Sequence, residues 1–165
     1  MRYLDAKKSV DDRALHRPTV DRLGAELDSR ATARDGEPIR ILEVGFGIGT
    51  MLERLCAWDA LPSQVEYVGV DIDDTNIAAA SDRLTDGDFE QTASHQFSRT
   101  NDDETVTVEL HAADAFEFAA NRYDPTAADP QFDLLIGMAF LDIVPFAQVA
   151  QQLLPLISGG GLGYF

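Results

Sequence analysis

The first regular pattern along the chain is helical. Apolar residues between Val10 and Leu27 recur at intervals close to one helical turn, which predicts an amphipathic helix. The polar stretch 28–38 follows it and is expected to be a linker. The sequence therefore divides into an N-terminal helix with its linker, residues 1–37, and a second part, residues 38–165.

Short apolar runs alternate with helical patterns in the second part. The runs are rich in β-branched residues and are bounded by glycine, proline or polar residues, which predicts strands at 39–44, 65–70, 105–111, 132–137 and 162–165. Apolar spacing of three and four residues predicts helices at 48–56, at 75–84, from about 114 and from about 145. The stretch 85–104 is polar and has no sustained period, so we expect a long surface loop there.

This alternation predicts the fold class. Strands that alternate with helices pair in parallel through right-handed crossovers, and continuous apolar strands indicate a sheet covered on both faces. We therefore expect an α/β domain with a doubly wound, mainly parallel sheet of about five strands. The last apolar run leaves a strand edge that proteins normally pair or cover, so we also expect C-terminal strands to be missing.

A glycine-rich run lies between the first predicted strand and the first predicted helix of this domain. From Glu43 to Thr50 it reads E-V-G-F-G-I-G-T, with Gly45, Gly47 and Gly49 at every second position. Glycines allow the backbone to approach a ligand closely, and the following helix N-terminus supplies free N–H groups. Open α/β sheets bind their ligands at such turns, although the glycine pattern alone is a weak signal.

Acidic residues follow the next two predicted strands. Asp71 ends the second strand, where a carboxylate can accept hydrogen bonds from both hydroxyls of a ribose. Asp114 follows the third strand and is also a good N-cap for the next helix. Asp73 and Asp74 are interpreted as solvated acids or a helix cap. Together with Glu43, acids at three successive strand ends agree with an adenosine-containing ligand across the carboxyl edge of the sheet.

These motifs resemble those of class I S-adenosylmethionine-dependent methyltransferases over about residues 39–165. The glycine run is similar to the first motif of that family, and Y-V-G-V-D-I-D at 67–73 is similar to the second. A-A-D-A at 112–115 matches the place where the family contacts adenine, and F-D-L-L-I-G-M-A-F at 132–140 resembles the motif that lines the transfer site. That last motif departs from the N-P-P-[FY] version, so it gives no clue to the methyl acceptor.

The resemblance implies S-adenosyl-L-methionine as cofactor and methyl transfer to an acceptor that the sequence does not identify. The cofactor-binding residues it implies are Glu43, Gly45, Phe46, Gly47, Gly49, Asp71, Ile72, Asp114, Ala115 and Gly137. Because N-terminal segments of the family often fold over the pocket, candidate substrate-side groups are Tyr3, Arg13, His16, Arg17 and Asp142. No catalytic residue is assigned, and three scattered histidines show no metal-ligand spacing.

Two other functions fit parts of the pattern. An NAD(P)- or FAD-dependent oxidoreductase domain would use G-x-G-x-x-G to hold a pyrophosphate, but Thr50 occupies the sixth position here. In addition, Glu43 would bring negative charge toward phosphates, whereas it would attract the ammonium group of methionine. A non-catalytic Rossmann-like interaction domain would have no need of the glycine run and the three acids.

The net charge of the chain limits which environments and which binding partners are expected. The chain has 29 acidic and 13 basic residues, which give a net charge of -16. Concentrated salt screens such self-repulsion, and the composition resembles that of proteins from salt-accumulating archaea. An ordinary acidic protein, or one with a basic partner, is the alternative. Tight nucleic-acid binding is not expected, because it needs clustered Lys and Arg.

The remaining sequence features concern location. No apolar stretch is long enough to span a membrane, and the first 30 residues are too charged for a signal peptide. We therefore expect a cytoplasmic protein without a membrane partner. Cys56 is the only cysteine, which excludes an internal disulfide and fits a small core residue.

Overall fold

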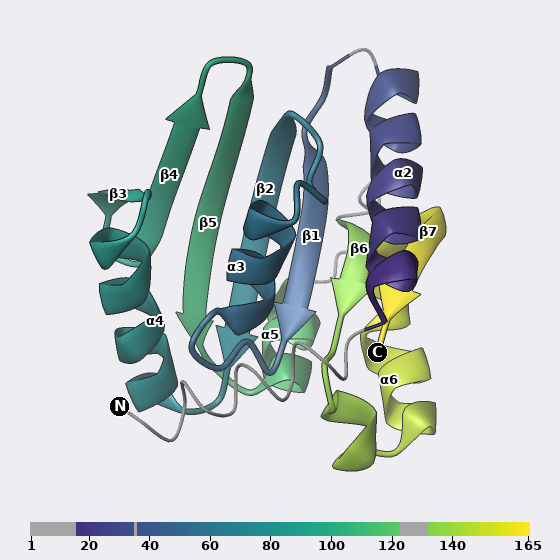
Figure 1. Cartoon of the computed structure of the whole chain (residues 1–165). Coiled ribbons are helices and arrows are strands. Elements are labelled where there is room, and N and C mark those ends of the chain that lie inside the picture. The colour runs from purple at the N-terminus through teal and green to yellow at the C-terminus, as the bar shows by residue number, and fades with distance from the viewer. Residues whose placement is uncertain (1–15, 35, 123–131) are drawn as a thin grey trace.

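The computed structural model describes residues 16–34, 36–122 and 132–165, which form three layers with a sheet in the middle (Figure 1). The sheet has seven strands in the order β3-β4-β5-β2-β1-β6-β7. Five of them run parallel: β1 (Ile39–Val44), β2 (Gln64–Asp71), β5 (Glu104–Ala112), β6 (Phe132–Ile136) and β7 (Ile157–Tyr164). The other two, β3 (Glu90–Ala93) and β4 (Gln96–Asn101), are antiparallel to their neighbours.

Helices cover both faces of the sheet (Figure 1). One face carries α2 (Arg17–Ala33), α3 (Thr50–Ala57) and α4 (Asp74–Asp86). The other carries α5 (Ala115–Arg122) and α6 (Phe146–Gln152), with the 3-10 turns η1 (Phe140–Asp142) and η2 (Leu154–Leu156). None of the helices in the described part of the chain is long and apolar enough to cross a membrane.

Two hydrophobic cores result, one on each side of the sheet. Successive strand residues face opposite sides, so Ile41 lies in the core under α2, whereas Leu42 lies in the core under α6. The buried stripe of α2, including Val20 and Leu27, belongs to the first core. The α/β fold class predicted from the sequence is confirmed by this arrangement.

The predicted number of strands is wrong. The stretch 85–104, expected to be a surface loop, contains the hairpin of β3 and β4, which brings the sheet to seven strands. Every residue of β3 is exposed and β4 buries only Phe97, so there is no apolar run to reveal either strand. Backbone pairing with β5, from Gln96 opposite Glu109 to Asn101 opposite Glu104, holds the hairpin instead.

Two other predictions at the ends of the domain need correction. The expected linker begins inside α2, which continues to Ala33 because its polar residues form the exposed face of the helix. The part of the predicted helix before residue 16 lies outside the described residues. The sheet also gives no support to the expectation of missing C-terminal strands, which came from the strand edge left by the last apolar run.

An ion pair with a buried carboxylate ties the end of α2 to the sheet. Asp133 in β6 is only 2% exposed, and its two carboxylate oxygens lie 2.7 and 2.8 Å from the guanidinium nitrogens of Arg34. The backbone N–H of Arg40 in β1 donates to the same carboxylate at 2.9 Å. One carboxylate thus holds a helix end and two neighbouring strands together.

We expect Asp133→Ala to lower the free energy of unfolding by about 2–3 kcal/mol, because it leaves the Arg34 guanidinium and the Arg40 N–H without their acceptor. Urea denaturation at constant high salt measures the change. Asp21→Ala is the control, because it breaks an exposed pair within α2, between Arg17 and Asp21, and should cost less than about 0.5 kcal/mol. Equal effects of the two substitutions would contradict this role of Asp133.

Candidate cofactor site

The glycine run forms the turn between β1 and α3 at the carboxyl edge of the sheet. Gly45, Gly47 and Gly49 have φ angles of 70°, 58° and 81°, a backbone region that favours glycine over other residues. The N–H of Phe46 donates to the carbonyl of Val70 at 3.0 Å, which holds the turn against β2. The alternating glycines of the sequence are therefore required by the conformation of this turn.

The side chain of Phe46 packs between the glycine turn and β2. The ring is 3% exposed, and a Cβ added at Gly69 in β2 would lie 2.7 Å from its Cγ and Cδ2 atoms. It also packs edge-on to Tyr67, with ring centroids 6.2 Å apart. Since the whole residue is buried, Phe46 packs the turn against β2.

Asp71 is joined directly to the glycine turn. Its Oδ2 atom accepts a hydrogen bond of 2.7 Å from the N–H of Gly47. Its Oδ1 atom accepts from the N–H of Asp73 at 2.9 Å and from the side-chain amide of Asn76 at 3.2 Å. A carboxylate offers about four acceptor positions, so Oδ2 keeps capacity for one further donor such as a ribose hydroxyl.

Asp114 caps α5, as its alternative interpretation from the sequence predicted. Its Oδ1 atom accepts from the N–H groups of Phe116 at 2.8 Å and Glu117 at 3.1 Å, so Oδ2 is not used by the cap. The next residue, Ala115, is buried at the start of the helix. Ile72, by contrast, is 75% exposed and presents an apolar side chain to solvent directly after Asp71.

The strand order places these groups in one row. Asp114 follows β5, Asp71 ends β2, the glycine turn follows β1 and Gly137 follows β6, and these four strands are neighbours in the sheet. Because the four strands are parallel, all these positions lie at the same edge. Residues spread over almost 100 positions of the sequence thus lie along one edge of the sheet.

Aromatic side chains surround Gly137 at the end of this row. A Cβ added at Gly137 would lie 3.0 Å from two ring carbons of Phe165 and 3.2 Å from Cβ of Phe140. The Phe140 ring also reaches toward the glycine turn, 3.6 Å from a Cβ built at Gly45. The absence of a side chain at Gly137 therefore makes room for rings of the protein itself. Both rings therefore lie at the Gly137 end of the row.

Glu43 lies beneath the turn rather than at its surface. The side chain is 2% exposed, and the Tyr67 hydroxyl donates to its Oε2 atom at 2.5 Å. Burial raises the pKa of Glu43 to about 8, with the Tyr67 hydroxyl and the Arg54 charge acting in the opposite direction. At neutral pH this carboxyl group is mainly protonated, so the negative charge expected from the sequence is largely absent. Tyr67 and Arg54 were not among the residues that the motif indicated.

The structure assigns local roles to other acids and to the substrate-side candidates. Asp73 caps α4 by accepting from the Thr75 N–H at 2.9 Å, and its hydrogen bonds to Thr75 lower the pKa of Asp73. His16 contacts Thr19 on α2 through its Nδ1 atom.

Arg17 pairs with Asp21 at 2.7 Å and lies over the Trp58 ring, while Asp142 is exposed in η1. Tyr3 and Arg13 lie outside the described residues. Within the described ranges, no group of three or more His, Cys, Asp or Glu side chains could hold a metal ion.

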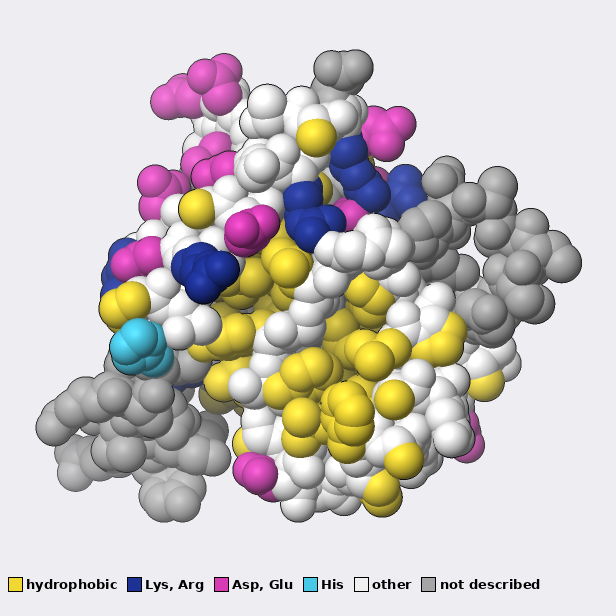
Figure 2. Space-filling view, turned by 90° about the vertical axis from the view of Figure 1, so that its right-hand side faces the viewer, with side chains coloured by type: hydrophobic (Ala, Val, Ile, Leu, Met, Phe, Trp, Pro, Cys, Tyr) yellow, Lys and Arg dark blue, Asp and Glu magenta, His cyan; other side chains and the backbone are white. Residues whose placement is uncertain are grey.

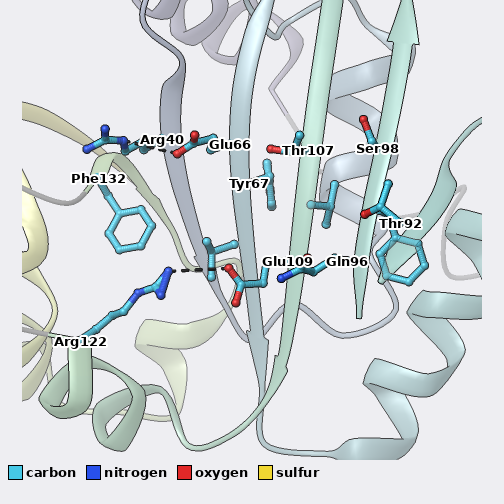
Figure 3. A pocket seen from close by; sticks show the side chains of 13 residues that line it. Arg40, Glu66, Tyr67, Thr92, Gln96, Ser98, Thr107, Glu109, Arg122 and Phe132 are labelled. Atoms are coloured by element: carbon cyan, nitrogen blue, oxygen red, sulfur yellow. Dashed lines mark ion pairs between the residues drawn. The ribbon is translucent and has the colours of Figure 1, made fainter. Parts of the chain in front are cut away.

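A groove of about 710 Å³ lies away from this edge, over strand positions on the side of α5 (Figure 3). Two ion pairs span it, Arg40 with Glu66 at 3.5 Å and Arg122 with Glu109 at 3.8 Å. None of the residues predicted to bind cofactor lines it. The groove and the sequence motifs therefore indicate different places on the protein. The backbone geometry of the glycine turn is the stronger evidence for a cofactor site.

Comparisons with known proteins establish the fold. No family model matches the sequence, and no curated protein matches it significantly. The plantazolicin methyltransferase BamL, solved with a triazolic desmethylPZN analog and SAH, matches with a TM-score of 0.50 and 16% identity, over 93% of this chain and 47% of BamL. The O-methyltransferase TomG from Streptomyces achromogenes, solved with SAM, matches with a TM-score of 0.49 and 20% identity, over 84% of this chain and 52% of TomG.

The chain therefore spans about half the length of the structures it resembles. Its arrangement of strands and helices is an α/β, Rossmann-like fold that it shares with BamL.

We expect Glu43→Gln to flatten the pH dependence of stability. A carboxyl group whose pKa is higher in the folded than in the unfolded state favours folding at low pH, and this contribution is lost as the pH rises from about 4.5 to about 8. The variant should gain stability relative to the wild type across that window, on the order of a few kcal/mol. Urea denaturation at several pH values measures it.

Glu66→Gln removes an exposed carboxylate from the neighbouring strand and serves as the control. Its pH profile should stay parallel to that of the wild type. If the Glu43→Gln profile also stays parallel, Glu43 is ionised in the folded protein and the interpretation fails.

Proposed function

We propose that this chain binds S-adenosylmethionine at the carboxyl edge of its sheet and belongs to a methyltransferase acting on an unidentified acceptor. The observation that carries the proposal is the hydrogen bond from Gly47 to Asp71, within the row that ends at Asp114 and Gly137. The presence of SAH in BamL, whose fold this chain shares, supports the same ligand class here.

The residues of the row fit the parts of this cofactor. The left-handed glycine turn exposes its backbone to the methionine part, and the free acceptor capacity of Asp71 suits a ribose hydroxyl. The uncapped Oδ2 atom of Asp114 suits the adenine amino group, and the exposed side chain of Ile72 suits an adenine face. The buried Glu43 supports the turn from below rather than contacting the ligand.

Methyl transfer requires little acid–base catalysis from the protein. When bound, S-adenosylmethionine supplies a sulfonium methyl group with an already activated leaving group, so positioning and exclusion of water can provide much of the acceleration. Phe140 and Phe165 pack around Gly137 and would exclude water from that end of the row. No side chain of the described residues is assigned as a catalytic base.

We also propose that the protein works in the cytoplasm of a cell with concentrated salt. The net charge of -16 supports this proposal, because screening relieves the repulsion among its carboxylates. Binding experiments are therefore designed at high potassium chloride concentration.

Calorimetric titration at high salt tests the cofactor directly. We expect saturable binding of S-adenosylhomocysteine and no saturable binding of NAD, because the turn has the spacing of a methionine-binding loop and not of a pyrophosphate-binding loop. Binding of NAD alone would favour a dinucleotide-dependent enzyme. A folded protein that binds neither would refute the proposed site on this chain.

Asp71→Ala tests the role of the acid at the end of β2. Loss of a charged acceptor for a ribose hydroxyl should weaken S-adenosylhomocysteine binding about 10- to 100-fold. The substitution also removes the acceptor of the Gly47 and Asp73 N–H groups, so circular dichroism must show that the variant is folded.

Asn76→Ala is the matched control, because it removes one donor to Asp71 and keeps the carboxylate. It should change the affinity less than about threefold. If both variants bind as the wild type does, Asp71 does not hold the ribose.

A further inference from the structure

The end of β2 meets the glycine turn at three successive residues. The carboxylate of Asp71 accepts from the Gly47 N–H at 2.7 Å, and the carbonyl of Val70 accepts from the Phe46 N–H at 3.0 Å. Gly69 meets the turn in a different way, through the space that its missing side chain leaves for the Phe46 ring. The first two contacts are hydrogen bonds, whereas the third depends on shape alone.

Position 69 requires glycine for space and not for backbone conformation. Gly69 lies inside β2, paired with Glu43 of β1 on one side and with Leu110 of β5 on the other. Its φ angle is not positive, so alanine could adopt the same backbone. A Cβ built there would nevertheless lie 2.7 Å from Cγ and Cδ2 of Phe46 and 3.0 Å from Cδ2 of Leu110. The Phe46 ring therefore occupies the space that a side chain at position 69 would fill.

The same ring extends to the far end of the turn. Its Cγ and Cδ2 atoms lie over Gly69, and its Cζ and Cε1 atoms lie 3.2 and 3.3 Å from a Cβ built at Gly49. Gly49 is the N-cap of α3, so the ring reaches from β2 to the start of that helix. Tyr67 packs edge-on against it. One ring thus fills the space between the strand and the turn.

The Phe46 ring has no solvent-exposed side into which it could turn. Hydrophobic side chains do gather at the surface of this protein, as the face in Figure 2 shows, and Phe146 is 61% exposed. Phe46, by contrast, is 3% exposed, and Tyr67 beside it is 1% exposed. A close-packed interior accepts an added methyl group only when the neighbouring atoms move. A methyl group at Gly69 would therefore displace the Phe46 ring together with the turn that carries it.

The displacement is large on the scale of the site. Ordinary contacts of a Cβ begin at 3.4 Å, so the Phe46 ring would have to move by about 0.7 Å from its separation of 2.7 Å. The same movement of the turn would lengthen the hydrogen bond from Gly47 to Asp71, now 2.7 Å, to about 3.4 Å, whereas N–H···O bonds extend only to about 3.2 Å. Because β2 is held between β1 and β5, the turn is the part that would move.

We propose that Gly69 is a positioning residue of the cofactor site, which acts through the Phe46 ring to hold the Gly47 N–H within reach of Asp71. Phe46, which the motif implied as a cofactor contact, is then a spacer between the strand and the turn. The geometry of this proposal stands on the contacts of the turn, and only its effect on a ligand rests on the proposed function.

Gly69→Ala tests the proposal through the affinity for S-adenosylhomocysteine. Calorimetric titration at high potassium chloride concentration should show binding at least about tenfold weaker than in the wild type, because the turn loses its hydrogen bond to the charged Asp71. Circular dichroism must show that the variant is folded.

Gly24→Ala is the matched control. It adds the same methyl group to a buried glycine of α2, whose nearest neighbouring atoms belong to Ala60 and not to the turn. Its affinity for S-adenosylhomocysteine should stay within about twofold of the wild type, whatever its effect on the urea midpoint.

Phe46→Ala tests the same contact from the other side. This variant should also bind more weakly, because the turn loses its spacer. In the double variant Gly69→Ala/Phe46→Ala, the added methyl group no longer meets the ring, so the affinity should recover at least about threefold relative to Gly69→Ala. Independent effects of the two substitutions would instead make the double variant the weakest binder.

Hydrogen exchange of the Gly47 amide requires no ligand and therefore separates this proposal from the proposed function. The amide should exchange at least about tenfold faster in Gly69→Ala and in Phe46→Ala than in the wild type, because its acceptor on Asp71 is out of reach. If the wild type binds no S-adenosylhomocysteine but Gly47 exchange responds in this way, the proposed function fails and the role of Gly69 stands.

Three results would overturn the proposal. The first is unchanged Gly47 exchange in folded Gly69→Ala or in folded Phe46→Ala, since the ring would then not position the turn. The second is a folded double variant that binds no more tightly than Gly69→Ala. The third is an equal loss of affinity in Gly24→Ala, which would make the effect one of general stability.

Discussion

The parallel pairing of β1 with β2 is the constraint on which the carboxyl edge depends. Its register sets Val44 opposite Val70, so the chain leaves β1 directly beside the end of β2. From that position the Gly47 N–H reaches the Asp71 carboxylate without further adjustment. A shift of one residue would also turn every side chain of β1 to the other core. The hydrophobic pattern of the strands therefore fixes the register on which the geometry of the site depends.

Three acids that look equivalent in the sequence have different physical roles in the fold. Asp71 and Asp114 follow strand ends, where backbone N–H groups are free to donate to them. Glu43 lies within β1 on the side of Tyr67, where burial favours its neutral form. The acid of the glycine motif therefore supports the turn from the core, and in the proposed function the two acids at the edge are the groups that would face the ligand.

The distribution of charge is as informative as its total. Most of the chain mixes carboxylates with few basic residues, which suits a surface in concentrated salt. The segment 143–165 departs from that pattern, because it contains no Asp, Glu, Lys, Arg or His.

The sequence by itself determined the α/β class, the five parallel strands and the glycine turn, because buried strands need continuous apolar runs and left-handed turns need glycine. It did not reveal β3 and β4, whose exposed polar residues are held by backbone pairing with β5, a contact without a side-chain signature. Nor did it show that Glu43 is buried against Tyr67. Only the tertiary structure decided that, because burial and the resulting pKa depend on which strands and helices surround a residue.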